Sequence, residues 1–241
     1  MMNIHIITLL LGLLFQRTAP VDVQTTVHFK ITSDKNIPSE TIQQMKDSLE
    51  STYSFYQKDL YLSAYRRISV RFLGNKSRYE STLKYTLFEF ASFTDNTIYI
   101  HADLFQEDAK KIQFVLSRVV VHALTSQISG CPRWLGAAYS MYVGNEVHTF
   151  DAFAGKSFYD FSDMDEEFNR ATSISEMKSV YSGLGSTIQF LTEQYGERKV
   201  KLLFSQMKKG SSLEQAFQTL FGLSLDEVQE SWQRSASSRR K

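Results

Sequence analysis

The stretch QFVLSRVVVHALTSQISGCPRWLGAAYSMYV, residues Gln113–Val143, decides the fold. Its first part, Gln113–Ile128, is apolar around almost the whole helical circumference, which is typical of a helix inside the core of a domain. Ser129-Gly130-Cys131-Pro132 interrupts this pattern, because Gly and Pro break helices. Arg133–Val143 then begins a second helix that is rich in aromatic side chains. We therefore expect a core helix followed, directly after the break, by an aromatic one.

Short runs upstream of these helices predict a small sheet. Thr25–Thr32 alternates polar and apolar residues with a period of two, as do Arg67–Leu73 and Asn96–His101. Such alternation is typical of half-buried strands. Residues 16–24 are interpreted as a polar linker before the first strand. The front half is therefore predicted to be α+β.

Further helices are predicted on both sides. One runs from an N-cap at Ser39 to about Lys58, with apolar residues at helical spacing: Ile42, Met45, Leu49, Tyr53 and Tyr56. The back third holds four more, separated by glycines: Ser186–Tyr195, Glu197–Lys209, Ser212–Phe221 and Ser224–Arg234. Ser212 and Ser224 suit the N-cap position. The polar, basic tail Ser235–Lys241 is interpreted as a frayed end.

Composition excludes several classes of protein. The chain has 241 residues, of which 42% are hydrophobic, so it is long enough to bury a sizeable core. Its 27 Lys and Arg residues almost cancel its 26 Asp and Glu residues, and no basic field argues for nucleic acid as a partner. The single cysteine, Cys131, excludes an intrachain disulfide and a cysteine-rich zinc knuckle.

The first 23 residues are interpreted as a secretory signal peptide or an N-terminal anchor. Ile4–Phe15 is an apolar run of 12 residues, shorter than the ~20 that a membrane-spanning helix needs but within the range of a signal peptide. We therefore expect a secreted or cell-envelope location, periplasmic or extracellular. An uncleaved segment would attach the protein to a membrane, and a buried N-terminal helix is the alternative.

Three segments resemble the peptidase MA-like domains of the gluzincin type of zinc metallopeptidase. VVVHALTSQI (Val119–Ile128) falls where that family has a helix with His-Glu-Leu-Thr-His. CPRWLGAAYSMYV (Cys131–Val143) is similar to the family's Pro-x-Trp-Leu-x-Glu-Gly-x-Ala-x-Tyr segment, and Ser186–Trp232 is similar to its carboxy-terminal helices. The resemblance covers residues 25–232. It implies a zincin-like α+β fold in which a small mixed sheet packs on a helical core, over residues 24–145. An all-helical subdomain, residues 146–234, and a tail, residues 235–241, would follow.

The resemblance also identifies the positions of the family's zinc site. In the family, two His residues at i and i+4 and a downstream Glu bind Zn²⁺, and the intervening Glu is the general base. His122 matches the first zinc ligand, whereas Ala123 replaces the catalytic Glu, Ser126 the second His and Ala137 the downstream Glu. Since one imidazole does not hold catalytic zinc, we expect no metal cofactor and no hydrolysis by the usual route.

Four residues are predicted to line what remains of the cleft, namely His122, Trp134, Tyr139 and Tyr142. Core packing is the alternative for each of them. A relocated metal site is conceivable at His101 with Asp103, or at His148 with Asp151, but neither spacing matches a known ligand set. A calcium site among the carboxylates of residues 151–167 lacks the ligand spacing and the glycine of a calcium loop.

The predicted function is a catalytically inactive peptidase MA-like domain that binds a peptide or protein. Two alternatives remain open. The first is a metal-dependent peptidase with a non-standard site, built from His122 together with His101, His148 or the acidic residues 151–167. The second is a structural envelope protein held by its N-terminal segment. A binding module should show an open concave site, and a structural protein a filled one.

Overall fold

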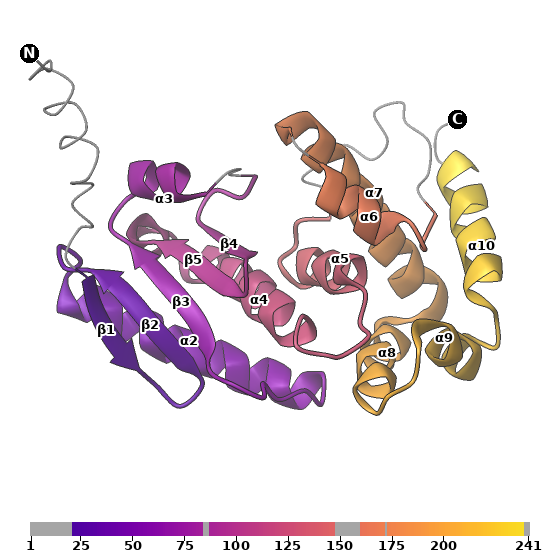
Figure 1. Cartoon of the computed structure of the whole chain (residues 1–241), viewed down its shortest axis with the longest axis horizontal. Helices are drawn as coiled ribbons and strands as arrows, with labels where there is room; N and C mark the ends of the chain where they lie inside the picture. The colour runs from indigo at the N-terminus through magenta and orange to yellow at the C-terminus, as the bar shows by residue number, and fades with distance from the viewer. Residues whose placement is uncertain (1–20, 84–86, 148–159, 172, 239–241) are drawn as a thin grey trace, which may run out of the picture.

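The computed structural model describes residues 21–83, 87–147, 160–171 and 173–238 of the chain. It shows a five-stranded sheet at the N-terminal end, helices packed on that sheet, and a helical C-terminal part (Figure 1). The predicted α+β class, with the sheet first and the helical part last, is confirmed. The predicted signal or anchor run Ile4–Phe15 lies outside the described residues. No helix in the described ranges has the length and apolar character needed to cross a membrane.

The sheet has the strand order β1-β2-β3-β5-β4. Its strands are β1 (Val21–Thr25), β2 (Phe29–Asp34), β3 (Ile68–Leu73), β4 (Ala91–Thr94) and β5 (Thr97–His101). The central strands β2, β3 and β5 run parallel, while β1 and β4 pair antiparallel at the two edges. A turn of Asp95 and Asn96, both with positive φ (48° and 57°), joins β4 to β5. Such left-handed backbone is typical of tight hairpin turns.

The first predicted strand is wrong in its bounds. Residues 25–32 contain the end of β1, a turn and the start of β2, and residues 21–24 are a strand rather than a linker. Glu50 fixes this turn by accepting hydrogen bonds from the Thr26 hydroxyl and from the backbone and ring nitrogens of His28. β1 is a short edge strand whose Val23 is 55% exposed, and its alternation, VDVQT, contains only two valines, so the strand signal is weak.

Two long helices cover one face of the sheet: α2 (Ser39–Asp59) and α4 (Ala109–Thr125). The apolar positions predicted for the first of them are all buried, as expected: Ile42, Met45, Leu49, Tyr53 and Tyr56. Its predicted Ser39 cap is wrong, since Pro38 precedes the helix and no side chain caps it. The short helix α3 (Lys76–Thr82), which the pattern did not predict, packs on the opposite face through Tyr79 and Leu83. The 3₁₀ helix η1 (Ala102–Gln106) links β5 to α4.

The predicted break and second helix are confirmed, since α5 spans Arg133–Val143. The helical part continues with α6 (Met164–Arg170), α7 (Ile174–Tyr195), α8 (Glu197–Lys208), α9 (Leu213–Phe221) and α10 (Leu225–Ser238). α7 begins twelve residues before the predicted Ser186, at a capping box of Ser173 and Glu176. Its first half contains Gly183 and Gly185, which lower the helix propensity of the segment. The frayed tail is wrong for residues 235–238, since α10 includes them and Ala236 is buried.

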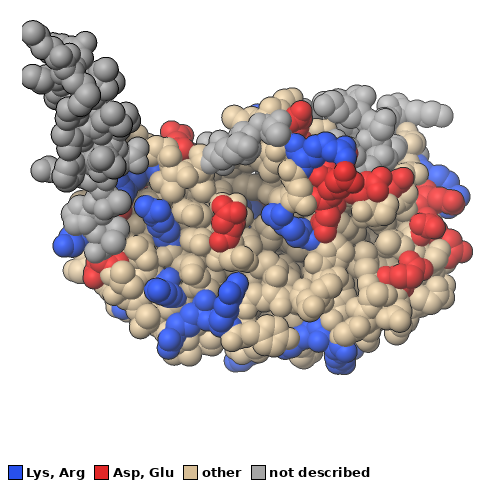
Figure 2. All heavy atoms as spheres, viewed as in Figure 1, with Lys and Arg blue, Asp and Glu red and all other residues tan. Residues whose placement is uncertain are grey.

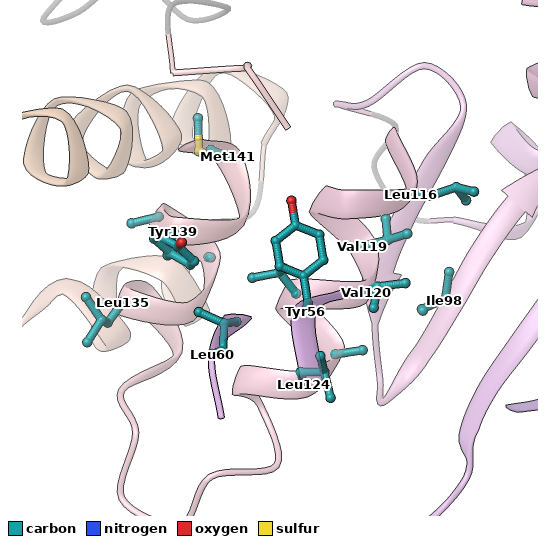
Figure 3. Close-up of a cluster of buried hydrophobic side chains, with 14 of the residues drawn as sticks. Tyr56, Leu60, Ile98, Leu116, Val119, Val120, Leu124, Leu135, Tyr139 and Met141 are labelled. Carbon is teal, nitrogen blue, oxygen red and sulfur yellow. The ribbon is translucent and has the colours of Figure 1, made fainter. Parts of the chain in front are cut away.

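The core is continuous from the sheet to the helical part. Figure 3 shows Tyr56 of α2 and Leu60, directly after that helix, between two groups of apolar side chains, one from α4 and β5 and one from α5. The first group contains Ile98, Leu116, Val119, Val120 and Leu124, and the second contains Leu135, Tyr139 and Met141. α5 therefore joins the two halves, because it packs on α4 at one side and on α7 at the other.

Candidate functional site

A pocket of about 650 Å³ lies where the edge of the sheet meets the helices. Its wall is formed by β4, by α4 and by the start of α5, and by residues of α6 and α7 on the far side. Figure 2 shows the hollow near the middle of this face, with side chains of both charges around it. The volume lies in the range of sites for small molecules or short peptide segments. We call this hollow the main pocket.

His122 lies in the main pocket, on α4. Its ring packs against Phe93 of β4, with 4.9 Å between the ring centroids, and forms no hydrogen bond with any described residue. Burial, followed by the positive charges of Arg118 and Arg133, lowers the pKa of His122 to about 3. The imidazole is therefore neutral at physiological pH and presents one donor and one acceptor nitrogen to the pocket.

The three positions that the resemblance aligns with the family's base and two of its ligands carry no carboxylate or imidazole. Ala123 and Ala137 are fully buried, and the exposed Ser126 donates its hydroxyl to the carbonyl of Ala123 at 2.9 Å. The helices that bear these residues cross closely at Gly136, where an added Cβ would lie 2.5 Å from Oγ1 of Thr125. The two helices that carry the site therefore pack closely against each other, while the side chains at residues 123, 126 and 137 are small.

The residues present do not fit a zinc site of the family's kind. Within residues 21–83, 87–147, 160–171 and 173–238, no three His, Cys, Asp or Glu side chains cluster as metal ligands. His101 lies away from the main pocket: its ring is buried between Tyr79 and Phe90, Nε2 is 2.8 Å from the Glu89 carbonyl, and Nδ1 is 3.5 Å from Asp103. His148 and Asp151, proposed from sequence for a relocated site, lie outside the described residues.

Cys131 is a second ligand-type residue in the wall of the main pocket. Its thiol lies 3.6 Å from the carbonyl of Pro132. Burial, with a smaller contribution from the carboxylate of Asp165, raises the pKa of the thiol to about 12. A protonated thiol is a poor metal ligand and a poor nucleophile, so the pocket gains no reactive group from this residue.

Arg118, which sequence reasoning did not single out, connects the pocket to the sheet. Its guanidinium forms an ion pair with Glu146 at 2.8 Å and donates to the carbonyl of Ala91 at 2.7 Å. The same group lies 3.7 Å from the centre of the Phe88 ring. A charged residue within an otherwise apolar helix was the signal that could have identified it, since a buried charge requires partners.

Of the four residues predicted for the cleft, the structure places only His122 in the wall of the main pocket. The rings of Trp134, Phe161 and Trp232 form a buried stack, with centroid separations of 5.1 and 5.5 Å. Tyr139 packs on Phe204 of α8. Tyr142 stacks on Tyr139, and both hydroxyls make long hydrogen bonds to Glu197, of 3.4 and 3.5 Å.

The acidic stretch has a structural role where it is described. The carboxylate of Asp165 accepts hydrogen bonds from the backbone nitrogens of Arg133 and Trp134, so it caps the N-terminus of α5. Glu166 and Glu167 pair with Arg170 on the same helix. These carboxylates face their own helix ends and partners rather than a shared cation position.

A comparison against protein families identifies the family of the chain. A family model of the Peptidase MA superfamily matches residues 82–238, which is more than half of the chain and includes α4, α5 and the whole helical part. The chain belongs to the Peptidase MA superfamily. A search of curated proteins found no match to it.

Proposed function

We propose that this chain is a catalytically inactive member of the Peptidase MA superfamily and that it binds a peptide or protein segment in the main pocket. The observation that carries the proposal is the wall of that pocket, where one neutral imidazole, the small residue Ser126 and the edge of a sheet lie together. A secreted or cell-envelope setting is part of the proposal and rests on the apolar run near the N-terminus.

The residues at the family's functional positions support the loss of catalysis. Deprotonating a zinc-bound water requires a base such as the family's Glu, and the methyl group of Ala123 cannot accept a proton. Ser126 and Ala137 offer no substitute for the missing imidazole and carboxylate. A buried Glu without a metal would lose several kcal/mol of solvation or become protonated, so small neutral residues are compatible with a metal-free pocket.

The position of β4 supports peptide binding. This strand is at the edge of the sheet and pairs with β5 alone, while Ser92, Phe93 and Thr94 line the main pocket. An extended peptide can add to such an edge through main-chain hydrogen bonds. The ring of Phe93 and the neutral imidazole of His122 would then contact the peptide's side chains, because both lie in the same wall.

The open pocket also favours binding over a purely structural role, for which a filled cleft was expected. The non-standard peptidase has weaker support, since the buried His101 is not among the wall residues of the main pocket, which contains His122.

Zinc content and peptidase activity test the inactive assignment. The full chain, purified after zinc supplementation, should contain almost no zinc by elemental mass spectrometry, and neither it nor the His122→Ala variant should cleave unfolded casein. One equivalent of zinc that disappears in His122→Ala, together with cleavage, would overturn the proposal. A variant with Ala123→Glu, Ser126→His and Ala137→Glu is the positive control, because it restores the family's ligand and base residues.

A further inference from the structure

A second, smaller pocket of about 280 Å³ adjoins the main pocket. We call it the arginine pocket, because Arg66 and Arg67, just before β3, form one side of it. The turn between β4 and β5 and the C-terminal end of α4 form the rest of its wall. Four residues belong to the walls of both pockets: Phe93, Asp95, Asn96 and Ser126. A ligand lying along β4 would therefore continue into the arginine pocket.

We call the region where the two pockets meet the junction. Two of the replaced positions lie there. Ser126 is in both walls, and Ala123 is in the wall of the arginine pocket. The family has His and Glu here, and both side chains are much larger than those of Ser and Ala. The replacements therefore remove volume from the junction as well as chemistry from the metal site.

The charges in the arginine pocket favour an anionic group. Nε of Arg67 donates to the carbonyls of Thr26 and Val27, at 3.0 and 3.3 Å, which fixes the side chain and leaves its terminal nitrogens for a ligand. Arg66 is exposed and forms no hydrogen bond or ion pair with a described residue. Asp95 is the one carboxylate among the wall residues, so the two guanidinium groups leave an excess of positive charge.

We infer that the two pockets form one groove, and that the peptide bound along β4 carries a carboxylate that pairs with Arg66 and Arg67. The planar guanidinium fork matches a carboxylate in two parallel hydrogen bonds, which makes this group a better fit than a neutral one. The inference rests on the proposed function, since it names the chemistry of the peptide that the main pocket holds. An acidic side chain and a C-terminal carboxylate present the same group.

Selection from randomised peptides tests the inference without a known ligand. The immobilised full chain is exposed to two octapeptide libraries, one with free and one with amidated C-termini, and bound peptides are sequenced by mass spectrometry. We expect Asp or Glu enrichment at one position of the amidated library if a side chain provides the carboxylate. Preference for the free C-terminus is expected if the chain end provides it. Affinity should fall about fivefold in Arg66→Gln/Arg67→Gln, as for partly exposed ion pairs.

Two further variants distinguish the effect of the arginine charges on peptide binding from the effect of the open space at the junction. Ser126→Gln fills the junction without adding a metal ligand, and it should abolish the acidic preference while leaving the arginines in place. Lys76→Gln/Lys110→Gln removes two exposed positive charges outside both pockets, and it should bind as wild type does. Melting curves identify any variant that fails to fold.

The outcomes distinguish the two proposals. Enriched peptides without an acidic preference, or a preference that survives in Arg66→Gln/Arg67→Gln or in Ser126→Gln, would overturn the inference and leave peptide binding intact. Enrichment of no peptide from either library would overturn the proposed function and this inference with it.

Discussion

Two sets of residues on α5 differ in the size of their side chains. Trp134 packs in the stack with Phe161 and Trp232, and Tyr139 packs on Phe204. Gly136 and Ser140, in contrast, form part of the pocket wall. Large buried rings stabilise the fold, whereas the α5 residues that border the pocket are small. This contrast teaches that one helix serves both core packing and the pocket through side chains of different size.

The largest expected effect is the difference in stability loss between two phenylalanine substitutions. Phe161→Ala removes the buried ring between two tryptophans, and it should lower the free energy of unfolding by about 3–5 kcal/mol. Phe93→Ala removes a partly exposed ring from the pocket wall, and it should cost roughly half as much. Urea denaturation of both variants measures the difference. Equal losses would mean that the pocket wall is as important for stability as the aromatic core.

The ion pair beside the pocket is expected to have the next largest effect. Glu146→Gln leaves the buried guanidinium of Arg118 without a counter-charge, and it should cost about 1–3 kcal/mol. The carbonyl of Ala91 and the ring of Phe88 still contact the cation, which limits the loss. Glu166→Gln, in an exposed pair with Arg170, is the control and should cost less than 1 kcal/mol. Similar losses in the two variants would contradict a buried, stabilising pair.

Adding one methyl group where α4 and α5 cross closely is expected to destabilise the protein. Gly136→Ala places a Cβ 2.5 Å from Oγ1 of Thr125, and the overpacking should exceed the helix-propensity gain, for a net loss of about 1–2 kcal/mol. Thr125→Ala in the same chain removes the clashing atom. A double-mutant cycle should therefore show that the two substitutions compensate. Purely additive losses would show that the cost of the added methyl group does not come from its contact with Thr125.

The smallest effect is expected from the neutral imidazole in the pocket. The pKa of His122 is lowered to about 3 in the folded chain, against about 6.5 when unfolded. The unfolded state therefore binds the proton first as the pH falls below about 6.5, and folding stability decreases on acidification.

Comparison with His122→Gln isolates this contribution. Between pH 7 and pH 5, the free energy of unfolding of the wild type should fall by roughly 1 kcal/mol more than that of the variant. This figure is reduced because the pocket admits water. At pH 7 the two melting temperatures should show no such difference. Melting curves across this range measure it, and a wild type that gains stability in acid relative to His122→Gln would contradict a neutral imidazole.

Local sequence patterns were sufficient to predict the helices whose signal was strong. The periodicity of Ile42, Met45 and Leu49 predicted the buried side of α2, and Gly130 with Pro132 predicted the break before α5. Sequence failed for β1, because the alternation of this exposed edge strand contains only two valines. It also failed for the first half of α7, where Gly183 and Gly185 lower the helix propensity although the apolar residues keep helical spacing. In both elements the local signal was weak, and tertiary packing stabilises the structure that forms.

The same distinction between what sequence and what tertiary structure determine applies to the site. Sequence alone determined that Ala123, Ser126 and Ala137 offer no carboxylate or imidazole, because residue identity fixes which atoms are available. That these are the positions of the family's base and two of its ligands is what the resemblance predicts. It did not determine which aromatic residues line the pocket, since Trp134 and Tyr139 are in the core and Phe93 is in the wall.

Only the tertiary structure brought Arg66 and Arg67 next to Ser126, residues about 60 positions apart in the chain. The parallel crossover from β2 through α2 to β3 places the start of β3 beside the end of α4. No local pattern encodes that proximity. The sequence determined which residue types stand at the positions that resemble the family's zinc site, and the packing of sheet on helix decided which space and charges lie beside them.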